Sequence, residues 1–306
     1  QTCALPISGV ASDVNATTVT VSDGAGHTAV ATNIAGTWTA DLTGLNRGAL
    51  TVTADVADAA GNHTTVTQTV YSSISAAVSA AAAGSTVTIA AGTYSNASSI
   101  TIDKSIHIVG GDGVVINQTA GTHGFVVQGS IAGGVEITGV KMVGGAEGVF
   151  VNGSDRDTSV GSLSVTNSTF VGQSTAGVHL ALENSGSDIR NLTVQGVVFD
   201  QSGSAGKAQS SNMGVNTYEG IRSYGFDGDA LLKDVTVNGA TGGVTTGVSQ
   251  YGVHFQGASS NNMGPTGKDG NGPTMGNMTL DNVDVAGGFA KVAFAFDNYA
   301  DINGVK

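Results

Sequence analysis

Four short segments repeat one pattern, a glycine followed by alternating apolar residues, and they carry the side chains best suited to chemistry. The segments are GVFVNG (148–153), GVHLAL (177–182), GIRSYG (220–225) and GVHFQG (252–257). If each is a β-strand, its second and fourth residues face the core and its third faces away, because side chains alternate across a strand. The third residues then form a column, which in chain order reads Phe150, His179, Arg222, His254 and, from AKVAFAF (290–296), Ala293.

The predicted column suits binding or acid–base chemistry on an acidic sugar chain. Tyr224 and Gln256 lie two residues further along the same face, and neighbouring strands are roughly 4.8 Å apart. Arginine binds a carboxylate with two hydrogen bonds, histidine exchanges a proton near neutral pH, and tyrosine offers a ring or an acid–base group. The candidate catalytic residues are His179, Arg222, Tyr224 and His254, and the candidate binding residues add Phe150 and Gln256. The simpler alternative is a solvent-exposed polar ladder without a ligand.

Two aspartates in GIRSYGFDGD (220–229), Asp227 and Asp229, are candidate Ca²⁺ ligands, because carboxylate oxygens suit this ion. The alternative is a plain turn. Two long insertions, at 202–219 and 258–277, flank the predicted column and share the letters SSNMG and SSNNMG. They are either two arms of a binding face or degenerate copies of a repeat.

A longer repeat predicts the fold of residues 72–306. Five segments align: VEITGVKMVGG (135–145), LSVTNSTFVGQ (163–173), LTVQGVVFDQS (192–202), ALLKDVTVNGA (230–240) and MTLDNVDVAGG (278–288). At one fixed place they carry Gly139, Asn167, Gly196, Asp234 and Asn282. These residue types tolerate a positive φ, so the place is predicted to be a tight corner between two strands. Regular strands with insertions confined to turns indicate a coil of stacked strands.

The segment SISAAVSAAAAGSTVTIAAGTYS (73–95) predicts a short helix, a stop at Gly84 and a strand. It resembles the entry of right-handed parallel β-helix proteins of the pectate-lyase-like kind, in which a helix caps the first coil. That fold serves polysaccharide lyases, hydrolases and epimerases as well as adhesins. The triplet DPH of alginate epimerases and the NTD, DD, GHG and RIK set of polygalacturonases are missing here.

Residues 8–70 read as short alternating strands. TTVTVSDGAGHTAVATN (17–33) predicts a hairpin, DAAGN (58–62) a second turn, and Trp38 a core side chain. Together they resemble the bacterial Ig-like modules of large surface adhesins, a family that implies a spacer or adhesive role. The leader QTCALPI (1–7) is what a sequencing-library adaptor encodes, so we expect it to be non-native and the chain to be truncated at both ends.

Composition narrows the possible partners. The formal net charge of −12 disfavours nucleic acid and anionic membranes. The longest weakly polar run, at 73–84, is too short to be a membrane-spanning segment. The single cysteine, Cys3, lies in the suspect leader, so we expect neither a disulfide framework nor a thiol nucleophile.

The sequence therefore predicts an all-β chain, an N-terminal Ig-like β-sandwich followed by a right-handed parallel β-helix with a short N-terminal capping helix. We expect an extracellular or bacterial cell-surface adhesin-like protein whose partner is an extracellular polysaccharide or a host or biofilm surface. The first alternative is a polysaccharide lyase, glycoside hydrolase or uronate epimerase that uses the His, Arg and Tyr side chains, with Ca²⁺ as the only cofactor considered. The second is a passive structural stalk.

Overall fold

The computed structural model describes residues 15–302 except 35–36, 41–44, 46–48, 58–59, 61, 72, 183–185, 201, 203–218, 240–250, 257–273, 288–291 and 298–300. The chain divides into two compact units, one of Gln1–Ala80 with Ala90–Gly92 and the other of Ala81–Ile89 with Thr93–Lys306.

The first unit is built on an antiparallel sheet in the order β2-β1-β5-β6. Its strands are β1 (Asn15–Ser22), β2 (Thr28–Val30), β5 (Ala49–Ala57) and β6 (His63–Tyr71), and β3 (Thr32–Ile34) pairs separately with β4 (Thr37–Thr39). Alternation buries Val19 and Val21 against Leu50 and Val52. The hairpin predicted over 17–33 is confirmed by the β1–β2 pairing. The side chain of Trp38 lies outside the described residues.

The predicted short helix is α1 (Ile74–Ala80). The Ser73 hydroxyl accepts a hydrogen bond from the Ala76 backbone N–H (3.1 Å), which satisfies one of the free donors at the helix start. The helix ends four residues before the expected stop at Gly84, although Gly84 does have a φ of 78°. Among the described residues, no helix is long and apolar enough to cross a membrane.

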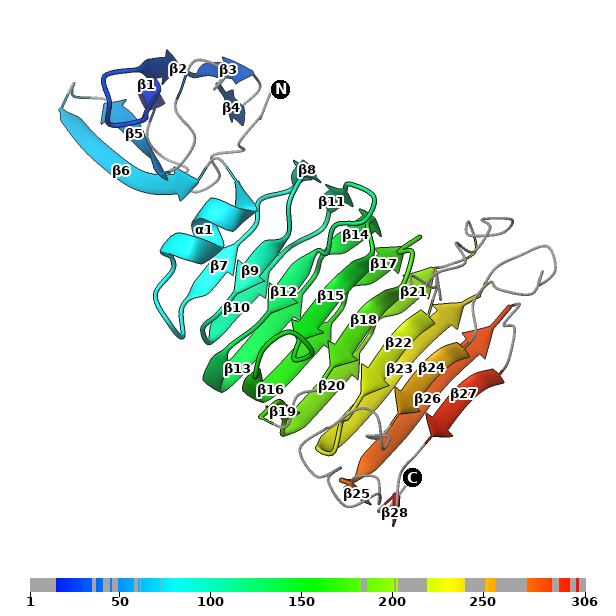
Figure 1. The fold of residues 1–306 in the computed structure, drawn as a ribbon. Helices are drawn as coiled ribbons and strands as arrows, with labels where there is room; N and C mark the ends of the chain where they lie inside the picture. Colours follow the sequence, from blue (N-terminus) through cyan, green and yellow to red (C-terminus); the bar gives the residue numbers. More distant parts are fainter. Residues whose placement is uncertain are drawn as a thin grey trace. The chain divides into compact units, whose positions relative to one another are not determined.

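In the second unit, each turn of the chain contributes strands to three places, and strands in the same place pair in parallel from turn to turn (Figure 1). The first place holds β7 (Thr86–Thr88), β10 (Ile106–Val109), β13 (Ser130–Thr138), β16 (Ser159–Thr166), β20 (Asn191–Gln195), β23 (Asp229–Asn238) and β26 (Met278–Ala286). The second holds β11 (Val114–Gln118), β14 (Lys141–Gly144), β17 (Thr169–Val171) and β21 (Val198–Asp200), with β8 (Gly92–Asn96) beside β11. The longer strand β23 pairs with both β20 and β21, so the first and second places form one sheet.

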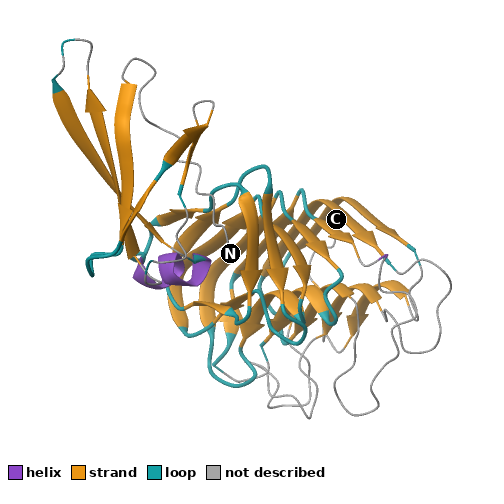
Figure 2. Cartoon of the chain, turned by 90° about the horizontal axis from the view of Figure 1, so that it is seen from above, coloured by secondary structure: helices purple, strands orange, loops and turns teal. Residues whose placement is uncertain are grey.

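The third place is a seven-stranded sheet. It holds β9 (Ile100–Ile102), β12 (Phe125–Val127), β15 (Glu147–Asn152), β18 (Ala176–Ala181), β22 (Glu219–Tyr224), β24 (Tyr251–Gln256) and β27 (Val292–Asp297). Short pairs complete the unit: β19 (Asp188–Ile189) against β16, and β25 (Thr274–Met275) with β28 (Asp301–Ile302). Figure 2 shows the strands of this unit in layers joined by turns. The expected all-β class with large parallel sheets is confirmed, and the arrangement is compatible with a β-helix.

All five predicted corner residues have a positive φ. Gly139, Asn167 and Gly196 lie between two strands as predicted, whereas Asp234 and Asn282 lie inside the longer strands β23 and β26. Gly139, Asn167, Gly196, Asp234 and Asn282 have φ values of 69°, 47°, 63°, 51° and 53°. The first residues of the five aligned segments are paired in register, from Val135 through Leu163, Leu192 and Ala230 to Met278. Corners also bond to one another, since the Asn282 side-chain amide donates to the Asp234 carboxylate (2.8 Å). Only residue types that tolerate the left-handed region can therefore close each turn.

We predict that Asn167→Val destabilises the protein by about 1–2 kcal/mol, because a β-branched side chain is strained at a φ of 47°. Asn167→Gly should unfold within about 0.5 kcal/mol of the parent, because glycine adopts this φ freely. Urea unfolding followed by circular dichroism measures both, with Thr193→Val in the middle of β20 as the control. Equal stability of Asn167→Val and the parent would contradict the corner assignment.

Candidate functional site

The seven-stranded sheet places the predicted column in register. Phe150 pairs with His179, His179 with Arg222, and Arg222 with His254. The last rung is Ala295 and not the predicted Ala293. The alternation in AKVAFAF repeats every two residues, so a shift by two keeps the same faces and the sequence could not distinguish the two registers.

Core packing explains the glycine at the second position of two of these strands, Gly148 in β15 and Gly177 in β18. A Cβ on Gly148 would lie 2.2 Å from Cδ1 of Phe170, and a Cβ on Gly177 would lie 2.1 Å from Cδ1 of Phe199. Phe170 and Phe199 are fully buried and stacked, with ring centroids 5.4 Å apart. The glycines therefore let the strands of the seven-stranded sheet approach the aromatic rungs of the core.

The face of this sheet opposite the core is itself largely covered. Phe150 is 9% exposed, His254 is 5% exposed, and the His179 side chain is 12% exposed. Phe150 packs with Val126 and Ala181 in a cluster of its own. The column is therefore not the solvent-exposed ladder that the sequence left open as an alternative.

Rings touch in sequence along this face. We call them the ring strip, and its members in order of contact are His123, Phe150, His179, Tyr224, His254 and Tyr251. Successive centroids are 4.6, 5.3, 5.9, 6.2 and 4.2 Å apart. Such spacings are those of favourable aromatic contacts, so the strip is one continuous packed feature.

Arg222 lies over the ring strip. Its guanidinium carbon is 4.7 Å from the centroid of the Tyr224 ring, and its Nη2 donates a hydrogen bond to the Tyr224 hydroxyl. Gln256 pairs with Tyr224 through the backbone, and its side chain lies outside the described residues. Arg222 and Tyr224 therefore form one cationic and aromatic unit.

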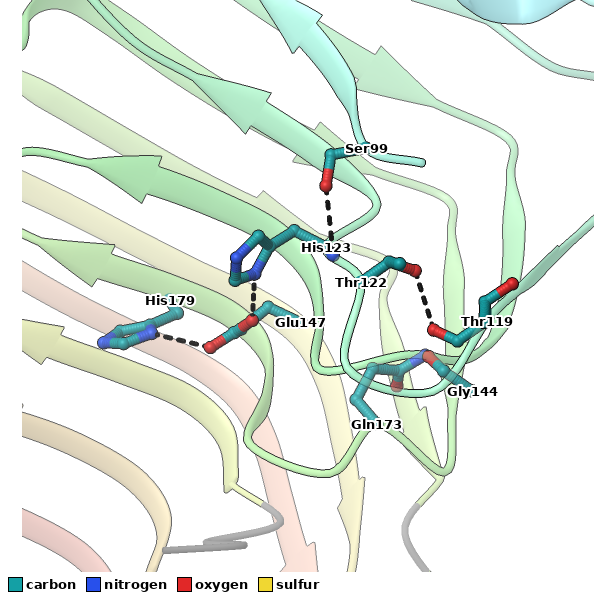
Figure 3. A network of polar contacts seen from close by, with 8 residues as sticks. All are labelled: Ser99, Thr119, Thr122, His123, Gly144, Glu147, Gln173 and His179. Atoms are coloured by element: carbon teal, nitrogen blue, oxygen red, sulfur yellow. Dashed lines mark hydrogen bonds and ion pairs between the residues drawn. The ribbon is translucent and has the colours of Figure 1, made fainter. Parts of the chain in front are cut away.

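A buried carboxylate joins two members of the strip. Glu147 is 5% exposed, and its Oε2 accepts a hydrogen bond from Nδ1 of His123 while its Oε1 accepts one from Nδ1 of His179 (3.3 Å). Figure 3 shows the two imidazole rings approaching the two oxygens of the carboxylate. The His123 backbone N–H is held in turn by the Ser99 hydroxyl (3.2 Å). Nε2 of His179 is buried and has no hydrogen-bond partner among the described residues.

These contacts set the charges of the cluster. Burial alone would raise the pKa of Glu147, but the hydrogen bonds from His123 and His179 outweigh it and hold the pKa at about 2. The hydrogen bond to Glu147 raises the pKa of His123 above its ordinary 6.5, against the opposing effect of burial. Glu147 is therefore a carboxylate at every physiological pH.

The sequence interpretation missed Glu147 and His123. Each directly precedes the glycine that opens a strand of the seven-stranded sheet, and Glu147 is in register with Ala176 and Glu219. Extending the segment GVFVNG by one residue toward the N-terminus would have found Glu147. Alternation could not, because all six residues of β15 are buried and the strand has no exposed face.

Asp227 and Asp229, the predicted Ca²⁺ ligands, lie near Asp188 and Asn277 respectively. Burial raises the pKa of Asp227 from 3.8 to about 6, and the nearby Asp188 carboxyl adds to the rise. Asp229 Oδ1 accepts hydrogen bonds from the backbone N–H (2.7 Å) and the side-chain amide (3.3 Å) of Asn277. In the described part of the chain, no group of three or more His, Cys, Asp or Glu side chains is arranged to hold a metal ion. Most of the two long insertions lies outside the described residues.

Comparison with known proteins gives no family. No protein-family model matches the chain, and no curated protein does. A similar solved structure is ORF18 of Geobacillus virus E2, which is 14% identical, with 71% of this chain and 52% of that chain covered and a TM-score of 0.18. The chain thus spans about half the length of that structure. A TM-score this low does not indicate a shared fold, so we carry nothing over from ORF18.

We predict that Gly177→Ala destabilises the protein by about 1–3 kcal/mol, because the new methyl group overlaps the Phe199 ring. Adding Phe199→Leu should recover part of this loss, so the two changes are not additive in a double-mutant cycle of unfolding free energies. Gly111→Ala is the control, since a Cβ there meets no atom within 4 Å. Strictly additive changes in unfolding free energy would show that contact with Phe199 is not what restricts position 177 to glycine.

We predict that Glu147→Gln lowers the free energy of unfolding by on the order of 3 kcal/mol, and that this loss is largest between pH 4.5 and 6.5. The pKa of Glu147 is lowered, so its contribution is present above pH 4.5 and is lost as the pH falls toward 2. The pKa of His123 is raised, so its contribution is present below pH 6.5 and is lost as the pH rises through the raised value.

Unfolding free energies of both proteins from pH 3 to 9 test this dependence. Glu136→Gln is the matched control, because Glu136 pairs with His107 at 3.0 Å while both side chains are about half exposed. Exposed pairs contribute little, so its effect should be small and flat with pH. A flat difference for Glu147→Gln as well would contradict the buried ion pair.

Proposed function

We propose that the chain is part of an extracellular or bacterial cell-surface protein of the adhesin kind, and that the ring strip with Arg222 binds glycans. The observation that carries the proposal is the continuous row of ring contacts on the face of the sheet opposite the core. Sugars pack their C–H faces on rings, and His123 and Tyr224 are members of the strip that keep exposed surface for such a contact.

The polar groups of the strip favour an acidic sugar. Arginine recognises a carboxylate with paired hydrogen bonds, and Arg222 is already oriented by the Tyr224 ring. Arg222 and Tyr224 are partly exposed, as is His123, so a ligand would meet these three side chains first. The net charge of the chain is −12, so Arg222 supplies a positive group on an otherwise acidic protein.

The finer architecture belongs to the same proposal. We assign the first unit to an Ig-like module and the second to a right-handed parallel β-helix of the pectate-lyase-like kind. The antiparallel sheet of the first unit and the three parallel strands per turn of the second support these assignments. A tandem of a spacer module and a long rigid surface suits adhesion.

One observation favours the alternative, a lyase, hydrolase or epimerase. Glu147 orients His179 in the way that a carboxylate orients a general base, and Nε2 of His179 has no partner in the described structure. In that case His179 would exchange a proton with the sugar, while Tyr224 and His254 lie next along the strip. Turnover, and not binding alone, separates this alternative from the adhesin.

We predict that the protein binds polymeric uronates, and that Arg222→Ala weakens the binding about tenfold by removing a charge-assisted hydrogen bond. Biolayer interferometry with polygalacturonate, alginate and neutral dextran, with and without Ca²⁺, measures this. Arg190→Ala removes the same charge from an exposed side chain outside the strip and should bind as the parent does.

Unsaturated-uronate absorbance and reducing ends are followed in the same samples. Turnover that is lost in His179→Ala would establish the enzyme in place of the adhesin. A folded protein that binds none of the polymers would overturn the glycan proposal in favour of a passive stalk.

A further inference from the structure

We propose that Nε2 of His179 is the acceptor of a sugar-hydroxyl subsite within the ring strip, and that Glu147 is the positioning residue that directs the proton of the neutral ring to Nδ1. The inference rests on the glycan-binding function proposed above and adds to it the chemistry of one contact.

The first step is the tautomer. A carboxylate has only acceptors, and Glu147 directs one oxygen at Nδ1 of His123 and the other at Nδ1 of His179. Both Nδ1 atoms must therefore carry a proton to make these bonds. In a neutral imidazole the other nitrogen is then a bare acceptor, so Glu147 selects the tautomer of the neutral His179 ring in which Nε2 accepts.

The second step is the missing partner. Nε2 of His179 is buried, and no donor among the described residues reaches it. Buried acceptors are nearly always paired in folded proteins, because a buried acceptor without a partner has lost its hydrogen bonds to water and gained none in their place. The side chain keeps 12% of its surface exposed, and the Tyr224 ring lies edge-on to the imidazole at 5.9 Å, so a rotation of Tyr224 would open Nε2 to an incoming donor while the contact of Nδ1 with Glu147 stays in place.

The third step is the kind of donor. A sugar carboxylate has no proton to offer at neutral pH, so it does not satisfy this nitrogen, whereas a sugar hydroxyl does. The Phe150 and Tyr224 rings lie 5.3 and 5.9 Å from the imidazole and flank the contact with apolar surface. Arg222 is on the adjacent strand, in register with His179. One uronate unit could thus place its carboxylate at Arg222 and a ring hydroxyl at His179.

The tautomer is tested without a ligand, by ¹⁵N NMR of the histidine side chains in the full chain at pH 7.5. We expect His179 in the form protonated at Nδ1, and a shift toward the form protonated at Nε2 in Glu147→Gln, because a glutamine can accept from only one of the two histidines. A His179 protonated at Nε2 in the parent would overturn the inference.

The subsite is tested by binding of polygalacturonate to two variants of His179. Asparagine retains a donor near Nδ1 but lacks any group at Nε2, whereas glutamine places its amide near Nε2. We expect about a tenfold loss in His179→Asn and less than a threefold loss in His179→Gln, with thermal unfolding confirming that both fold.

The outcomes separate the two proposals. Equal binding by the parent and both variants would leave only a water at Nε2 and overturn the subsite while the glycan function stands. An equal loss in both variants would also overturn it, because a merely structural role of the ring predicts that result. No binding by the parent would overturn the proposed function and, with it, the assignment of a hydroxyl ligand.

Discussion

Parallel hydrogen bonding between successive turns of the chain is the constraint on which the second unit depends. It repeats each side chain position from one rung to the next, so one residue type at a given position becomes a column. The columns on the inner face make the core, with Phe170 on Phe199. The columns on the opposite face of the seven-stranded sheet make the ring strip, and neither could form if a turn slipped by one residue.

Core and site are coupled through the glycines that open the strands. Gly148 and Gly177 have no room for a methyl group because the core phenylalanines occupy that space. The same glycines fix the start of each segment, and hence which side chain faces away from the core two positions later, Phe150 after Gly148 and His179 after Gly177. The pattern that marks the candidate site in the sequence is thus imposed by packing behind it and is not in itself a sign of function.

The sequence predicted the parts of the fold that depend on local backbone chemistry. Asn167 and Asp234 at corners, and alternation along each strand, follow from φ preferences and the two-residue period of a strand. It could not fix the last rung, because AKVAFAF allows two registers that bury the same faces. Glu147 escaped prediction for a different reason: its partners, His123 and His179, are brought to it only by the stacking of separate turns.

Glu147 stays ionised although it is buried, because two histidines together offset the cost of burying its charge. Removing the carboxylate from water disfavours its ionised form, and a hydrogen bond from a single surface imidazole would not compensate for this cost. Two Nδ1 donors, one from the turn before and one from the turn after, hold it ionised with a pKa of about 2. In its neutral form, each imidazole is thereby held in the tautomer protonated at Nδ1. The register of the three stacked strands places both histidines at Glu147. The buried carboxylate then selects the tautomer of His179, and with it the hydrogen-bonding role of Nε2 on the face of the sheet.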